Sequence, residues 1–174
     1  MRTLISAEEL KKRVKELGKQ ITEDYAGKDF TFLIILKGST LFGADLFREI
    51  KSHRVELDCI RLSSYHGTKS SGSVSMDQGE LARFEGRNLL IVEDIVDTGT
   101  TLSFFLKELE KVRPESVKIC SLFEKKEVNK GRVKVDYLGF DIRNEFIVGY
   151  GLDLDQKYRN LPDIEIYEES DKND

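Results

Sequence analysis

The feature that most constrains the fold is a series of short apolar runs of strand length, separated by segments with helical periodicity. Residues 30–36 read FTFLIIL, and further runs of strand character follow at residues 55–60, 88–92, 117–122, 135–140 and 146–148. A strand that is apolar on both faces is typical of a parallel sheet covered by helices on both sides. Alternation of strands and helices favours the same architecture. The sequence therefore predicts an α/β fold with a mostly parallel sheet flanked by helices.

Helical segments are expected at three places. Ser6 followed by Glu9 is a capping-box pattern, and apolar side chains then recur at helical spacing over residues 10–21. A second helix is expected to begin near Thr40, and a third to cover residues 100–112. Together with the apolar runs, these helices complete the predicted alternation.

Charge is concentrated at the end of the chain. The 174 residues carry a net charge of −4, and residues 163–174 alone hold six acids and one Lys. The rest of the chain is near neutral, which argues against a nucleic-acid partner. We expect residues 163–174 to form a solvated acidic tail.

Membrane insertion and secretion are also disfavoured by the sequence. No apolar run approaches the roughly 20 residues that span a bilayer, and the first residues lack the apolar segment of a secretory signal. Cys59 and Cys120 each lie in a strand-like run. A single disulfide is conceivable, but buried free thiols in a reducing compartment are favoured. We therefore expect a cytoplasmic protein without a membrane partner.

One long segment interrupts the alternation. Residues 63–79 contain six Ser and three Gly, and loops longer than about 12–15 residues are usually lids, binding loops or linkers. A linker between two domains is the alternative, but residues 1–62 supply too few strands for a complete sheet. We therefore predict a single domain over residues 1–174 in which residues 63–79 form a flexible lid.

The most informative motif is LLIVEDIVDTGTT at residues 89–101. An apolar strand is expected to end in Glu93 and Asp94, and residues 97–101 then lead into a helix. Free N–H groups and the helix dipole make such a turn suitable for phosphate, and ligands collect where parallel strands end. A plain helix cap would explain Asp97 or Thr98 but not the acidic pair. The Walker pattern and GxGxxG are both absent from the sequence.

This motif resembles the phosphoribosyl pyrophosphate (PRPP) binding motif of the type I phosphoribosyltransferases. The resemblance extends to Leu36-Lys37-Gly38, where Ser39 replaces a Gly often found there, and to Ser64-Tyr65 at the start of the predicted lid. The order of Lys125, residues 146–153 and Tyr158-Arg159 is similar to the hypoxanthine-guanine branch. The resemblance implies a small hood beside the main sheet.

The resemblance also implies an activity. The 5-phosphoribosyl group of PRPP would be transferred to N9 of hypoxanthine or guanine, giving IMP or GMP and pyrophosphate, with Mg²⁺ as cofactor. Cations and metal ions suit this chemistry because negative charge develops on the leaving pyrophosphate. Family members form dimers and tetramers, so a homodimer or homotetramer is expected.

Site residues follow from the same resemblance. Asp97 would accept the purine N7 proton, and Ser64 and Tyr65 would close over the reacting carbon. The residues implied in PRPP binding are Lys37, Gly38, Glu93, Asp94, Asp97, Thr98, Gly99, Thr100, Thr101 and Arg159. Those implied in purine binding are Lys125, Phe146, Ile147 and Asp153, and the implied metal ligands are Glu93, Asp94 and Asp153. A core position for Phe146 is an equal alternative.

Two other functions stay open at this point. The same chemistry could serve another base, such as xanthine, adenine or a pyrimidine. A PRPP-sensing regulator of the same fold would keep the nucleotide site but bind RNA or DNA. The near-neutral body and the intact Ser64-Tyr65 pair disfavour that regulator.

Overall fold

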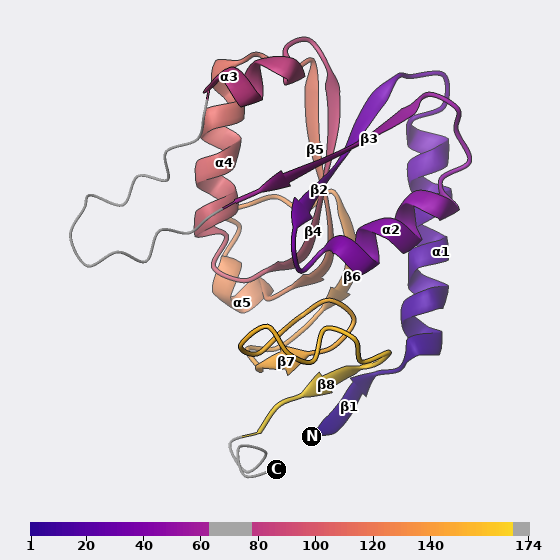
Figure 1. Ribbon diagram of the computed structural model, residues 1–174, viewed down its shortest axis with the longest axis vertical. Helices are drawn as coiled ribbons and strands as arrows, with labels where there is room; N and C mark the ends of the chain where they lie inside the picture. The colour runs from indigo at the N-terminus through magenta and orange to yellow at the C-terminus, as the bar shows by residue number, and fades with distance from the viewer. Residues whose placement is uncertain (63–77, 169–174) are drawn as a thin grey trace, which may run out of the picture.

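A parallel sheet forms the centre of the protein. The computed structural model describes residues 1–62 and 78–168, and within these ranges five parallel strands lie in the order β3-β2-β4-β5-β6 (Figure 1). The strands are β2 (Phe30–Leu36), β3 (Val55–Arg61), β4 (Asn88–Val96), β5 (Ser116–Glu124) and β6 (Tyr137–Asp141). The predicted α/β fold with a mostly parallel sheet is confirmed.

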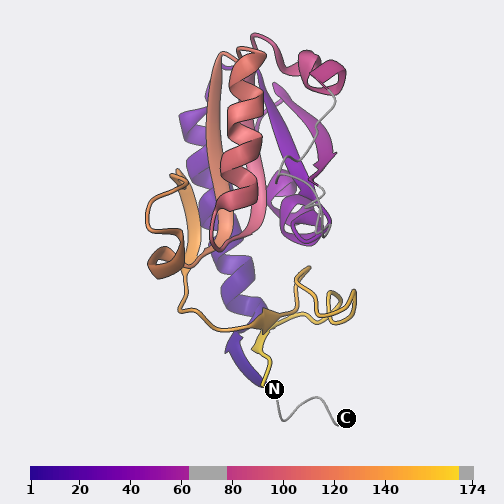
Figure 2. The same ribbon diagram turned by 90° about the vertical axis from the view of Figure 1, so that its left-hand side faces the viewer.

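Helices cover both faces of this sheet (Figures 1 and 2). The helices are α1 (Ala7–Asp24), α2 (Thr40–Glu49), α3 (Gln78–Leu81), the 3₁₀ helix η1 (Ala82–Phe84), α4 (Thr100–Lys111) and α5 (Lys126–Asn129). Phe32 and Ile34 of β2 are buried with α1 and α2. Leu33 and Ile35 are buried on the other face with α3, η1 and α4. Because both faces are buried, the strand reads as a continuous apolar run.

The capping box at the start of α1 is confirmed. Ser6 Oγ accepts a hydrogen bond from the Glu9 amide at 3.3 Å, and the Glu9 carboxylate accepts one from the Ser6 amide at 2.9 Å. These two bonds satisfy amide groups that would otherwise lack partners at the helix start. The helix therefore begins where the sequence pattern indicates.

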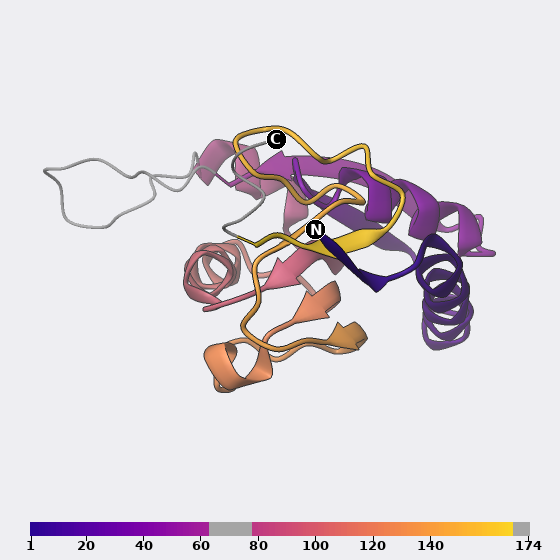
Figure 3. The same ribbon diagram turned by 90° about the horizontal axis from the view of Figure 1, so that it is seen from below.

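A small antiparallel sheet forms the hood. It consists of β1 (Arg2–Ile5), β7 (Ile147–Val148) and β8 (Ile164–Ile166), in the order β1-β8-β7. Figure 3 shows the hood lying across one end of the main sheet. The expectation of a solvated tail is wrong for residues 163–168, because Ile164 and Ile166 are buried in β8. Residues 169–174 lie outside the described residues.

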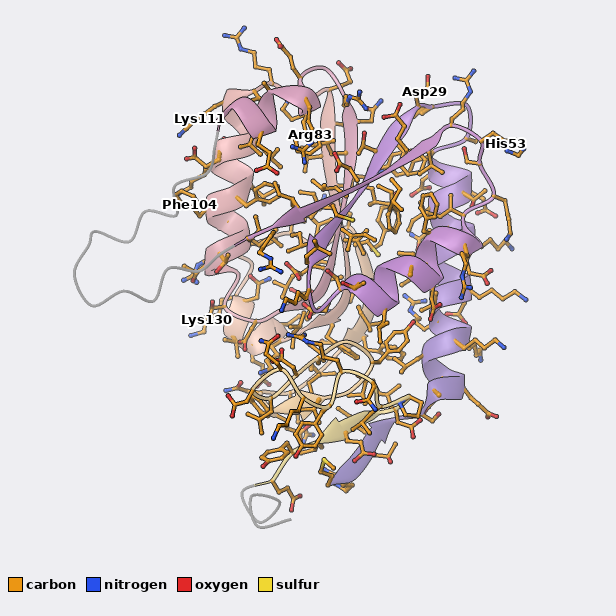
Figure 4. The ribbon with its side chains drawn as sticks, viewed as in Figure 1. Asp29, His53, Arg83, Phe104, Lys111 and Lys130 are labelled. Atoms are coloured by element: carbon orange, nitrogen blue, oxygen red, sulfur yellow. The ribbon has the colours of Figure 1, made fainter. Side chains whose placement is uncertain are left out.

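The carboxyl ends of the main strands face the hood. Asp29 and His53, which precede β2 and β3, lie at the opposite end of the molecule (Figure 4). Loops that follow the strands therefore meet the hood, at the sheet edge where ligands of α/β proteins bind. Within the described ranges, no helix is long and apolar enough to cross a membrane.

Three sequence expectations need correction or stay untested. Strand β4 continues to Val96 because its ladder with β5 continues through Val96 opposite Glu124, so the acidic pair lies within the strand rather than at its end. Cys59 is exposed, since β3 is an edge strand, whereas Cys120 is buried, and both thiols are free. Ser64, Tyr65 and most of the predicted lid fall within residues 63–77, outside the described residues; Gln78 already belongs to α3.

Candidate active site

Segments far apart in the sequence line one open cavity of about 570 Å³. The loop after β2, the end of β3, the acidic pair of β4, the beginning of α4 and the segment that joins β7 to β8 all contribute residues. The predicted site residues on its wall are Lys37, Gly38, Glu93, Asp94, Thr101, Asp153 and Arg159. The structure therefore brings together most of the residues expected to bind PRPP.

Gly38 allows the loop after β2 to approach both β4 and the hood. A Cβ atom at Gly38 would lie 1.6 Å from Asp94 Oδ2, so any side chain there would displace the carboxylate. A Cβ atom at Gly151 of the hood would lie 2.1 Å from the Gly38 carbonyl oxygen. The neighbouring Ser39 is fully buried, and its hydroxyl donates to the Ile35 carbonyl oxygen. Ser39 therefore directs its hydroxyl to the backbone of β2, and it is not among the residues that line the cavity.

The acidic pair is partly buried beside this loop. Burial raises the pKa of both carboxyl groups, and the charge of Asp94 raises the pKa of Glu93 further. The charge of Arg159 acts in the opposite direction on the pKa of Asp94. Glu93 Oε1 accepts a hydrogen bond from the Asp94 amide at 3.1 Å, and Asp94 Oδ1 accepts one from the Ile95 amide at 2.8 Å. A cation at this position would relieve the desolvation of both carboxylates.

The carboxylates that line the cavity are ligands of the kind that Mg²⁺ prefers. No group of three or more His, Cys, Asp or Glu side chains suited to a metal occurs among the described residues. Mg²⁺ usually binds through one or two carboxylates together with substrate phosphates and waters. Glu93 and Asp94, with Asp153 across the same cavity, supply carboxylates of that kind.

Cationic groups line the same cavity as the acidic pair. Arg159 Nη2 lies 2.7 Å from Asp153 Oδ1, and Arg159 Nη1 donates to the Gly151 carbonyl oxygen at 2.6 Å. Gln156 Oε1 accepts hydrogen bonds from Lys37 Nζ at 3.2 Å and from Arg159 Nη2 at 3.3 Å. Gln156 thus joins the two cations expected to bind pyrophosphate.

Sequence reasoning missed Gln156 and also Arg61, which lines the same cavity. Arg61 is the last residue of β3, one position beyond the predicted strand end. The rule that carboxyl ends of parallel strands gather at one edge could have found it. No such signal marks Gln156, which lies in an irregular hood segment.

The turn between β4 and α4 forms a second, smaller cavity of about 130 Å³ adjoining the first, since Glu93 and Thr101 line both. Gly99 has a left-handed backbone with φ of 70° and directly precedes α4. The Thr100 amide donates to Thr98 Oγ1 at 3.3 Å. Residues 97–101 therefore present the beginning of a 12-residue helix to the cavity, as expected for a phosphate site.

Lys125 lies beside Asp97, the first residue of this turn. Its ammonium group is 3.2 Å from Asp97 Oδ2 and 3.3 Å from Asn144 Oδ1. The Lys125 side chain is 9% exposed and that of Asp97 is 47% exposed. A buried ammonium group with two fixed acceptors is held in one position. Asn144 was missed, because an Asn in a polar loop carries no pattern of its own.

The remaining predicted purine-binding residues differ in exposure and in their contacts. Phe146 is 51% exposed and contacts the Tyr167 ring edge-on, so the core alternative for Phe146 is wrong. Ile147 is buried in β7. Asp153 is paired with Arg159 in the large cavity.

Comparison with known proteins agrees with this geometry. A sequence model described as "Phosphoribosyl transferase domain" matches residues 3–155. The chain belongs to the phosphoribosyltransferase family. The match spans the PRPP-like motif, the loop after β2 and the hood residues through Asp155.

Relatives within this phosphoribosyltransferase family are similar over nearly their whole length. The chain is 45% identical over 168 residues to a hypoxanthine-guanine phosphoribosyltransferase of Streptococcus thermophilus, covering 95% of this chain and 92% of the relative. It is 48% identical over 162 residues to one of Lactococcus lactis, covering 92% and 87%. A crystal structure of a hypoxanthine-guanine phosphoribosyltransferase of Bacillus anthracis superposes with a TM-score of 0.83 at 39% identity, covering 97% and 99% of the two chains.

Proposed function

We propose that this chain is a purine salvage enzyme that transfers the 5-phosphoribosyl group of PRPP to N9 of hypoxanthine or guanine. The products are IMP or GMP and pyrophosphate. The observation that carries the proposal is the pair of Lys125 and Asp97, which lie 3.2 Å apart. Asp97 is the first residue of the turn formed by residues 97–101 at the beginning of α4, called the phosphate-type turn below. Lys125 can donate to O6 of a 6-oxopurine, and Asp97 can accept from a protonated N7 beside it.

Base recognition follows from the hydrogen-bonding capacity of that edge. A 6-oxopurine presents O6 and N7 side by side. Lys125 has donors only and would bind O6. Asp97 would accept the proton that N7 carries, which becomes more acidic as the bond between N9 and the ribose carbon forms. Phe146, which is exposed, would stack on the base, while Ile147 and Asp153 would border it.

PRPP would bind along the two adjoining cavities. The hydroxyls of Thr98, Thr100 and Thr101, with the amides around Gly99, would donate to the 5-phosphate. Glu93 and Asp94 would accept from the two ribose hydroxyls or hold Mg²⁺ through them. When bound, Mg²⁺ would supply charge neutralisation for the pyrophosphate.

The leaving group would be held by the chain's own cations. Lys37, Arg159 and the amide groups around Gly38 line the cavity next to the acidic pair. These cations stabilise the negative charge that develops on pyrophosphate as the glycosidic bond breaks. Asp153, paired with Arg159, is the proposed ligand of a second Mg²⁺ on that group. Ser64 and Tyr65 would close over the reacting carbon and exclude water.

The experiment that tests the proposal is a nucleotide-forming assay. The purified chain is incubated with PRPP, Mg²⁺ and one base at a time: hypoxanthine, guanine, xanthine, adenine and uracil. We expect IMP and GMP from the first two bases. Absence of both nucleotides under these conditions would contradict the proposal, and product from uracil or adenine alone would redirect it to another base.

Assembly and location are part of the same proposal. We expect a homodimer or homotetramer, which light scattering coupled to size-exclusion chromatography measures directly. We also place the enzyme in the cytoplasm. The two free thiols, one exposed and one buried, fit a reducing compartment.

A further inference from the structure

Arg132 lies outside every motif considered so far but contacts the phosphate-type turn. Its Nη1 donates to the Thr98 carbonyl oxygen at 2.6 Å and to Thr100 Oγ1 at 2.8 Å. Figure 4 shows Lys130, two residues earlier in the chain, near the end of α4 opposite to Lys111. Lys111 is the last residue of α4, so Lys130 lies near the beginning of that helix. Arg132 belongs to the same segment after α5 and contacts the phosphate-type turn from there.

A rigid turn carries Arg132. Asn129 is buried, and its side chain accepts from the Val133 amide at 3.0 Å and donates to the Val133 carbonyl oxygen at 2.8 Å. The same side chain donates to Glu124 Oε1 at 2.8 Å, which ties the turn to the end of β5. The Arg132 amide donates to the Asn129 carbonyl oxygen at 3.0 Å. The backbone of Arg132 is therefore held in a fixed position relative to the sheet.

The same turn supports the phosphate-type turn from a second direction. A Cβ atom at Gly99 would lie 2.8 Å from Asn129 Oδ1 and 3.0 Å from Val133 Cγ2. The space between Gly99 and this turn is therefore too small for a side chain at Gly99. Arg132 and Asn129 thus lie against two different parts of residues 97–101, so the turn after α5 packs on the phosphate-type turn.

The hydrogen bonds at Thr100 have a direction. A hydroxyl group has one donor and two acceptor positions. Thr100 Oγ1 accepts from Arg132 Nη1 at 2.8 Å, and an Arg N–H group can only donate. The Thr100 oxygen therefore faces Arg132 with a lone pair, and its proton is turned toward another acceptor. A phosphate oxygen at the beginning of α4 is an acceptor suited to that proton.

The charge balance of this region also needs a cation. Residues 97–101 contain one ionisable side chain, Asp97, whose negative charge is paired with Lys125. A phosphate monoester brings roughly −1.5 to −2 charges at neutral pH. Arg132 supplies a permanent positive charge, and its two bonds to the turn use only Nη1. Among the described residues, the N–H groups on Nε and Nη2 make no hydrogen bond and remain for water.

We propose that Arg132 is a positioning residue for the 5-phosphate group, because it orients the Thr100 hydroxyl as a donor and supplies positive charge at the phosphate-type turn. The inference rests on the proposed function and assigns one more residue to it. It predicts that Arg132 affects ligands that carry a 5-phosphate and leaves the nucleoside part of the site unaffected.

The test compares binding of GMP with binding of guanosine, which lacks the phosphate. Arg132→Gln removes the positive charge. Lys134→Gln is the control, because it removes the same charge two residues away. The Lys134 ammonium pairs with Asp136 at 3.4 Å. Calorimetry should show Kd for GMP about tenfold weaker in Arg132→Gln, at the lower end for a charged hydrogen bond in an exposed position. Kd for guanosine, obtained by competition, should match the unsubstituted protein, and Lys134→Gln should match it for both ligands.

Further measurements separate orientation and charge from a general structural role. Arg132→Lys should recover part of the GMP affinity, since the charge returns without the planar fork of donors. GMP affinity should fall less steeply with added salt in Arg132→Gln than in the unsubstituted protein. Circular dichroism checks the fold of each variant, and if Arg132→Gln does not fold, Arg132→Lys is judged by the same ratio of GMP to guanosine affinity.

Two results would overturn the inference alone: GMP affinity in Arg132→Gln equal to that of the unsubstituted protein, or equal losses for GMP and guanosine. Failure of the unsubstituted protein to bind GMP would instead overturn the proposed function. The two failures are therefore distinguishable in one set of titrations.

Discussion

Asp97 is the residue at which the phosphate-type turn meets the base end of the candidate site. Its carboxylate lies on the same turn as Thr98 and Gly99, and it contacts Lys125 Nζ at 3.2 Å. This pairing explains how an acid can lie beside a phosphate site, because its charge is balanced by a cation. In the proposed function, N7 of the purine approaches Asp97.

Asp97→Asn should lower kcat by about 10²–10⁴-fold, the usual contribution of a general base, because an amide cannot take up the N7 proton. PRPP binding should be retained. Steady-state kinetics measure the first effect and equilibrium binding the second. The matched control is Asp141→Asn, which removes the same charge from an ion pair with Lys126 at 3.3 Å and should keep kcat near that of the unsubstituted protein. Unchanged turnover with lost PRPP affinity would make Asp97 a binding residue only.

Lys125 should decide between 6-oxopurines and adenine. The buried ammonium group donates to Asp97 and Asn144, and the amino group of adenine would place a donor against it. A site built to bond one substrate group can reject an analogue by about 10⁴–10⁵-fold. We expect kcat/KM for adenine to be lower than for hypoxanthine by about this factor.

Lys125→Ala should reduce the difference in kcat/KM between hypoxanthine and adenine, mainly by lowering kcat/KM for hypoxanthine. Lys126→Ala is the control, since Lys126 is the next residue in the chain and pairs with the exposed Asp141. Equal use of adenine and hypoxanthine by the unsubstituted protein would refute the role assigned to Lys125.

At the level of elements, the loop between β2 and α2 depends on the absence of a side chain at Gly38. Gly38→Ala would place a methyl group 1.6 Å from Asp94 Oδ2, so either the loop or the acidic pair must shift. We expect KM for PRPP to rise at least about tenfold, because a shift of about 1 Å in a binding group can cost 10²-fold in rate. Far-UV circular dichroism should stay unchanged.

Ser39→Ala is the control for Gly38→Ala. The Ser39 hydroxyl donates to the Ile35 carbonyl oxygen inside the protein. Its loss should lower the free energy of unfolding by about 1 kcal/mol, the usual contribution of one hydrogen bond, and leave KM for PRPP nearly unchanged. A rise in KM for PRPP in Ser39→Ala as large as in Gly38→Ala would show that the loop responds to any substitution.

At the level of the whole molecule, activity should depend on Mg²⁺. PRPP brings clustered phosphates to a cavity that already holds Glu93, Asp94 and Asp153, and Lys37 and Arg159 alone would neutralise that charge poorly. Excess EDTA should abolish nucleotide formation, and added Mg²⁺ should restore it. The assay of product against free Mg²⁺ measures this dependence. Full activity in excess EDTA would rule out the metal-dependent mechanism.

Local chemistry made the main sheet and the phosphate-type turn predictable. Burial of β2 and β4 on both faces produces continuous apolar runs that can be recognised without distant information, and the capping box of Ser6 and Glu9 acts within one helical turn. The acidic pair and residues 97–101 lie within one short motif, so their spacing along the chain indicated a phosphate site. Lid closure by residues 63–79 and the single-domain organisation stay predictions.

The hood could be predicted only partly. Strands β1 and β8 are short and pair with each other across about 160 residues, Arg2 lying opposite Ile166. Residues 163–168 read as part of an acidic tail, because the sequence does not show that Ile164 and Ile166 have a partner strand. The exposure of Cys59 was likewise not predictable, because it depends on the position of β3 at the edge of the sheet, which is set by strand order.

Local periodicity and contiguous motifs were enough to predict which segments become strands and helices and which residue types carry the phosphate chemistry. The folded chain alone shows which distant side chains meet: Gln156 between Lys37 and Arg159, Asn144 on Lys125, and Arg132 on Thr98 and Thr100. Such contacts arise where separate loops converge at one edge of the sheet, and a hydrogen bond between them leaves no pattern along the chain.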